Sequence, residues 1–145
     1  MVTSSPSSFS QHNPYISLTC IAANKPGSPD VDEVNASVGG GNGPAWTPPP
    51  GQIRPVTVSQ FGGPTAASFT DGTVGDDVVA VTIHAGPETV TATVQNGRYA
   101  AWWPGKAFVD GPLPPDGQGG PQEMLTYDVT LTNGTVKTNI TPATP

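Results

Sequence analysis

The sequence predicts an all-β protein, an antiparallel sandwich or partly open barrel of about seven short strands behind a Ser/Pro/Gly-rich N-terminal segment. Valine and threonine are abundant while leucine, glutamate and lysine are scarce, a composition that favours strands over helices. The chain has 145 residues, of which 18 are glycine and 18 proline, so we expect one domain with many turns. Several short runs also alternate apolar and polar residues, which is the period of a half-buried strand.

Composition divides the chain near residue 52. Residues 1–52 are predicted to be a low-complexity segment that ends in a Gly/Pro-rich linker, and residues 53–145 to be the β domain. Within the first segment, residues 15–21 form the one convincing apolar run, and we expect them to add a strand to the sheet built further along. Residues 28–38 begin with Ser-Pro and acidic residues and carry valines at helical spacing, which favours one or two helical turns.

The β domain is expected to begin with two strands, the second of which ends in a turn at Asp71-Gly72. A three-strand meander and a final hairpin are expected to follow. Asn96-Gly97 predicts a type I′ turn inside the meander, and Asn133-Gly134 predicts the turn of the final hairpin. The strands are expected at residues 56–61, 66–70, 78–84, 89–94, 98–103, 124–132 and 135–140. The alternation predicts a core of Val58, Phe69, Val79, Val81, Ile83, Val90, Val94, Tyr127, Val129, Leu131 and one of Trp102 and Trp103.

The stretch from residue 74 to 105 carries a motif. It contains Ala-Thr-Val-Gln-Asn-Gly at 92–97 and ends in Ala-Trp-Trp-Pro-Gly at 101–105. This hairpin resembles the extracytoplasmic C-terminal β domain of actinobacterial membrane proteins of unknown function. The resemblance implies a small β domain outside the cytoplasmic membrane, at the cell surface or extracellular, and brings no catalytic residue with it.

Charge and cysteine content exclude several classes of protein. With five basic residues and a net charge of −6, the chain has no basic patch for nucleic acid or an anionic membrane. No apolar run is long enough to cross a membrane, and residues 1–6 lack the features of a signal peptide. The single cysteine, Cys20, excludes an intrachain disulfide and has no neighbouring ligands for a structural zinc site. We therefore expect neither a metal nor a cofactor.

Aromatic residues are the candidate binding residues. Trp102 and Trp103 must point to opposite sides of one strand, so one is expected in the core and the other on the surface. An exposed tryptophan beside Tyr99 or Trp46 can stack on a sugar ring or on a proline-rich peptide. The candidate aromatic surface site is therefore Trp46, Tyr99, Trp102 and Trp103. Threonines at 89, 91, 93, 126, 130 and 132 are expected to line the outer faces of two strands.

Catalytic residues are few. His84 ends an apolar strand, where we expect it to be partly exposed, and no nucleophile-elbow motif accompanies it. The acids Asp71, Asp76, Asp77, Glu88 and Asp128 are expected mainly to form turns and keep the surface soluble.

These observations predict a protein that is not an enzyme. We expect a β-rich extracytoplasmic module that binds an unknown protein or a cell-surface glycan. Two alternatives are a homo-oligomeric structural subunit assembled by strand addition and a small hydrolase that uses His84 with a loop carboxylate.

Overall fold

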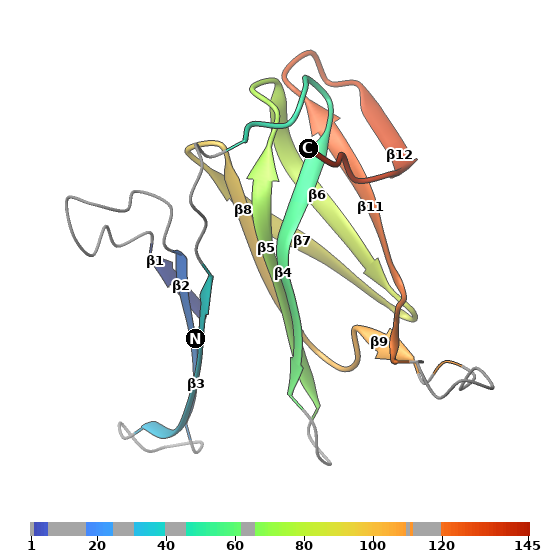
Figure 1. The fold of residues 1–145 in the computed structure, drawn as a ribbon. Coiled ribbons are helices and arrows are strands. Elements are labelled where there is room, and N and C mark those ends of the chain that lie inside the picture. Colours follow the sequence, from blue (N-terminus) through green and yellow to red (C-terminus); the bar gives the residue numbers. More distant parts are fainter. Residues whose placement is uncertain are drawn as a thin grey trace. The chain divides into compact units, whose positions relative to one another are not determined.

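The computed structural model describes the backbone of residues 2–5, 17–24 and 31–39, and both backbone and side chains of residues 46–61, 66–109, 111 and 120–145. Strands, turns and irregular segments make up this part of the chain, which contains no helix, so the all-β prediction is confirmed. The chain divides into two compact units, Met1–Trp46 and Thr47–Pro145 (Figure 1).

The N-terminal unit contains a three-stranded antiparallel sheet in the order β1-β2-β3. Its strands are β1 (Val2–Ser5), β2 (Ser17–Asn24) and β3 (Val31–Gly39). Of the strand expected at 15–21, residues 17–21 lie in β2 and residues 15 and 16 lie outside the described residues. This strand pairs with β1 and β3 rather than with the larger sheet. The helical turns expected at 28–38 are wrong over residues 31–38, which lie in β3, while residues 28–30 lie outside the described residues. Valine favours extended backbone, and pairing with β2 satisfies hydrogen bonds that a helix of one or two turns leaves open.

The second unit is built on a seven-stranded antiparallel sheet in the order β12-β11-β6-β7-β8-β5-β4. Its strands are β4 (Ile53–Phe61), β5 (Ala67–Val74), β6 (Val78–Ala85), β7 (Glu88–Gln95), β8 (Arg98–Pro104), β11 (Leu125–Leu131) and β12 (Val136–Ile140). A small second sheet pairs β9 (Phe108–Val109) with β10 (Gln122–Glu123). The meander β6-β7-β8 is as expected, and Asn96 and Gly97 both have the positive φ of a type I′ turn, 53° and 71°.

The expected turn at Asp71-Gly72 is wrong, because β5 runs straight through both residues. Gly72 lies where the carbonyl oxygen of Arg54 and the ring of Tyr99 approach the backbone so closely that a Cβ atom would collide with both. The glycine is therefore required for close approach of neighbouring chain segments and not for a turn.

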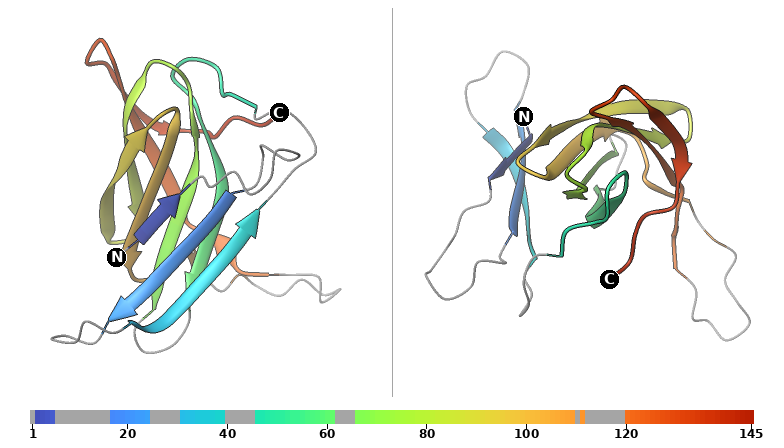
Figure 2. Two further views of the ribbon diagram at one scale, coloured as in Figure 1. Left: turned by 90° about the vertical axis from the view of Figure 1, so that its left-hand side faces the viewer. Right: turned by 90° about the horizontal axis from the view of Figure 1, so that it is seen from above.

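The sheet curls into a half-barrel, which Figure 2 shows from above. Every neighbouring pair is antiparallel, so seven strands leave the two edge strands, β4 and β12, parallel to each other. Short contacts cross the opening at two places. Ala143 N donates to Ile53 O at 2.8 Å, and the side-chain oxygen of Gln60 accepts from Ala107 N at 2.9 Å, while Met124 N donates to Ala107 O at 3.0 Å.

The core lies on the inner face of the curled sheet. Its largest cluster comprises Ile53, Val74, Val78, Val81, Ile83, Ala92, Tyr99, Ala101, Tyr127, Val129 and Leu131. Of the expected core residues, Phe69, Val81, Ile83, Trp103, Tyr127, Val129 and Leu131 are buried, and Val58, Val90 and Val94 are half-buried.

Val79 is the exception to the expected core, because its side chain is 51% exposed. Leu131 pairs with Val78, and Thr130 pairs with Ala80, so the register shifts at this point. The irregularity leaves Val78 pointing inward and Val79 on the surface.

Candidate functional site

Two consecutive tryptophans on β8 have opposite environments. Trp103 is 1% exposed and its indole N–H donates to Lys106 O at 3.2 Å. Trp102 is 48% exposed. The strand alternation therefore buries one ring in the barrel and presents the other on the outer face, as expected.

Tyr99 is not a surface residue, so its expected place in an exposed aromatic site is wrong, and of the two tryptophans Trp103 is the one in the core and so leaves the candidate site. Tyr99 and Trp103 both occupy the inward phase of β8, and Tyr99 is 2% exposed. Trp46 is half-buried and lies at the end of the N-terminal unit. Of the four candidates, Trp102 is the one that the structure exposes on the seven-stranded sheet.

Aromatic residues adjoin Trp102 on one side. Its cross-strand partner on β5 is Phe69, and the rings of Phe61 and Phe69 stack with centroids 6.0 Å apart and planes 12° apart. Directly paired residues of an antiparallel sheet point to the same face, so Phe69 lies beside Trp102 on the outer face, although its side chain is only 2% exposed.

Hydroxyl side chains cover the sheet on the other side of Trp102. The outward positions of β11, β6 and β7 form three rows of three, which we call the threonine grid. Six of its nine positions are threonine. Two rows are paired across all three strands: Thr126, His84 and Thr89; and Asp128, Thr82 and Thr91. In the third row Thr130 pairs with Ala80, and Thr93 is the next outward position of β7 after Thr91. The predicted outward stripes are present at Thr89, Thr91 and Thr93 and at Thr126 and Thr130, and β6 joins them. Thr132, expected in the second stripe, lies in the turn after β11.

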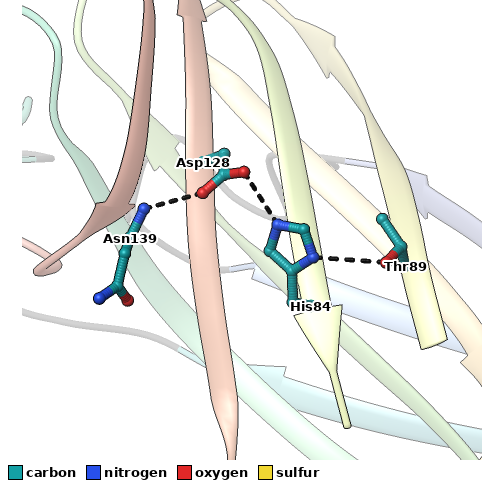
Figure 3. Close-up of polar contacts among 4 residues, drawn as sticks. All are labelled: His84, Thr89, Asp128 and Asn139. Atoms are coloured by element: carbon teal, nitrogen blue, oxygen red, sulfur yellow. Dashed lines mark hydrogen bonds and ion pairs between the residues drawn. The ribbon is translucent and has the colours of Figure 1, made fainter. Parts of the chain in front are cut away.

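His84 and Asp128 meet within this grid (Figure 3). Their Nε2 and Oδ2 atoms are 2.9 Å apart, and His84 Nδ1 lies 3.3 Å from Thr89 Oγ1. Because an ionised carboxylate only accepts hydrogen bonds, Nε2 donates to Asp128. The side chains are 38% and 22% exposed, so His84 has the partial exposure expected from the sequence.

Asp128 is also held from β12. Its Oδ1 accepts a hydrogen bond of 2.8 Å from Asn139 N, and Asn139 has a positive φ of 50°. The register of β11 and β12 shifts at this point, so the carboxylate fixes an irregularity of the edge strand. Both hydrogen bonds stabilise the ionised carboxylate and so lower the pKa of Asp128, the one from His84 more strongly than the one from Asn139 N.

Two of the other acidic residues, Asp71 and Asp77, lie within the fold of the sheet and its turns. Asp71 is 4% exposed on β5, and Asp77 Oδ1 accepts from Gly51 N at 2.5 Å, which joins two turns. Across residues 46–61, 66–109, 111 and 120–145, no three His, Cys, Asp or Glu side chains gather where they can hold a metal ion. Nor does this part of the chain form an apolar helix long enough to cross a membrane.

The pairing of His84 with Asp128 depends on strands far apart in sequence, which is why sequence reasoning named both residues without joining them. The one available signal was their phase, since each occupies an outward position of its strand. Searches against protein families, curated proteins and solved structures found no match for the chain.

Proposed function

We propose that the protein is a non-catalytic binding module, displayed outside the cytoplasmic membrane, whose ligand docks on the outer face of the seven-stranded sheet at Trp102. The observation that carries the proposal is the 48% exposure of Trp102 beside the fully buried Trp103. Exposed tryptophan on a rigid sheet supplies a large apolar contact surface at a low cost in conformational entropy. The cellular location rests on the resemblance of residues 74–105 to extracytoplasmic domains.

The test compares binding by the intact protein with binding by Trp102→Ala. Insoluble cell-wall material and immobilised glycans and peptides serve as probes, in sedimentation and plate assays. We expect Trp102→Ala to weaken binding at least about tenfold, as truncation of a central aromatic anchor does. Val79→Ala is the matched control, because it also shortens an exposed apolar side chain of the same sheet. Equal losses in the two variants, or none in Trp102→Ala, would reject the proposal.

The arrangement of Thr89, His84 and Asp128 supports hydrolysis as a second candidate function. In that reaction His84 Nδ1 would take the proton of the Thr89 hydroxyl while Asp128 holds Nε2. The cluster lies on the outer face of a sheet, where substrate would stay in contact with water, which weakens electrostatic stabilisation of a transition state.

An esterase and glycosidase screen separates the two functions. We expect no turnover above that of the His84→Gln variant. Turnover that disappears in both His84→Gln and Thr89→Val would establish the hydrolase instead.

A further inference from the structure

Trp102 lies beyond one end of a polar row that crosses three strands of the sheet. Asp128 pairs with Thr82, and Thr82 pairs with Thr91, so these three residues follow one another on β11, β6 and β7. The next strand is β8, where Ala100 pairs with Thr93. The pairing of β7 with β8 ends at this pair, so Thr91 and Trp102 are not directly paired, and Trp102 is the next outward position of β8 beyond the end of the pairing.

The chemistry of this row selects a class of ligand. Threonine hydroxyls both donate and accept hydrogen bonds, as sugar hydroxyls do. Asp128 uses one lone pair on each oxygen, for His84 and for Asn139 N, and retains others that can accept from a ligand hydroxyl (Figure 3). Trp102 supplies the apolar surface on which the carbon face of a sugar ring can stack.

Charge decides between neutral and anionic polymers. None of the nine positions of the threonine grid is lysine or arginine, and Asp128 contributes a carboxylate. The chain as a whole has a net charge of −6. Phosphate-bearing or uronic-acid polymers would meet like charge with no cation to pair with on the grid.

The length of the row decides between a single sugar and a chain of sugars. Paired strands are about 4.8 Å apart, so the two intervals from β11 to β7 span about 10 Å, and Trp102 lies beyond them on β8. A monosaccharide stacked on Trp102 would not extend to Asp128 at the other end. We infer that the occupant of this row is an extended neutral glycan, stacked on Trp102 and hydrogen bonded through Thr91, Thr82 and Asp128.

This inference rests on the proposed function, and its test uses the full chain in native gels that contain soluble polysaccharide. Each neutral polysaccharide of a panel is paired with its carboxymethylated derivative, so that only the charge of the polymer differs. We expect retardation by at least one neutral polymer and less by its charged counterpart. Titration with oligosaccharides of that polymer should show affinity that rises with chain length until the row is filled.

Two variants examine the row itself. Thr82→Val and Thr91→Val remove one hydroxyl each at nearly constant volume, and each should weaken binding about three- to tenfold, the effect of one neutral hydrogen bond. Thr138→Val on the edge strand β12 is the matched control and should leave binding unchanged. Melting temperatures of the three variants establish that the fold is intact.

The outcomes separate this inference from the proposed function. Retardation by no neutral polymer, equal retardation by the charged derivative, or full binding by both Thr82→Val and Thr91→Val would overturn the glycan inference. Binding of a peptide or protein that still requires Trp102 would overturn the inference and leave the proposed function standing. Glycan binding that survives Trp102→Ala would overturn the proposed function.

Discussion

The inner and outer faces of the seven-stranded sheet are built from the same strands and differ in almost every side-chain property. On β6 the inner positions are Val81, Ile83 and Ala85, all at most 1% exposed, while Thr82 and His84 alternate with them on the outside. The inner face has to exclude water, which fixes its residues as apolar. Along β11, β6 and β7 the outer face is under no such constraint, so its polar rows, and the exposed ring of Trp102 on β8, are informative about function.

The two tryptophans provide the largest expected contrast between the faces. Trp103→Ala removes a buried ring and should lower the free energy of unfolding by about 3–5 kcal/mol. Trp102→Ala should change it by less than about 1 kcal/mol, because nearly half of that ring is already in water. Chemical denaturation followed by circular dichroism measures both values. A loss in Trp102→Ala as large as that in Trp103→Ala would mean that the outer face is itself part of a core.

For most strands the sequence predicts which side chains face the core, but it does not predict where the strand register is irregular. The alternation of Tyr127, Val129 and Leu131 with polar residues predicted their burial correctly. On β8, alanines occupy both phases, so alternation alone did not decide between Trp102 and Trp103. Val79 was wrongly predicted to be buried, because the local register shift that exposes it arises from the pairing of β6 with the distant strand β11.

The candidate site was predictable in its parts only. Trp102, His84, Asp128 and the outward threonines all stand out in the sequence. Their adjacency requires the pairing of β6 with β11, which brings together the side chains of His84 and Asp128, 44 positions apart in the sequence. Short-range patterns contain no information about such a contact, because it depends on the order of strands in the sheet.

Gly72→Ala tests how tightly the inner face is packed. A Cβ atom at this position would collide with the carbonyl oxygen of Arg54 and the ring of Tyr99. Since a backbone atom cannot move aside alone, we expect destabilisation of about 1–3 kcal/mol, measured by thermal unfolding. Gly120→Ala is the control, because no atom lies within 4 Å of the added carbon. A Gly72→Ala protein as stable as the control would show that β4 and β8 are less closely packed than described.

Alkaline pH should also act through the inner face. Burial raises the pKa of Tyr99 and of Tyr127 above that of a free tyrosine. The unfolded chain therefore loses these protons first, so stability is complete below about pH 10 and falls as the pH rises further. We expect the midpoint of urea unfolding to decrease between pH 9 and pH 11, roughly one unit either side of that value.

The Tyr127→Phe variant isolates one of the two groups. It loses the hydrogen bond of 3.1 Å that the Tyr127 hydroxyl donates to Glu123, which should lower the free energy of unfolding at neutral pH. The loss should be only about 0.5–1.5 kcal/mol, because the exposed Glu123 carboxylate binds water instead. Its stability should then fall less steeply above pH 10 than that of the wild type. Identical alkaline slopes would mean that Tyr127 ionises in the folded protein as it does in the unfolded chain.

The smallest expected effect lies on the outer face, at Asp128. The hydrogen bond from His84 lowers the pKa of this carboxyl, so its contribution to stability is present above the unfolded pKa of about 4 and is lost as the pH falls below it. Asp128→Asn should therefore cost at most about 1 kcal/mol at pH 7, as expected for a partly exposed pair, and the difference from wild type should vanish near pH 2. Asp76→Asn, in an exposed turn, is the control at both pH values. A loss of several kcal/mol at pH 7 would contradict the contrast between the faces, because it would make an outer-face ion pair as important to the fold as a buried ring.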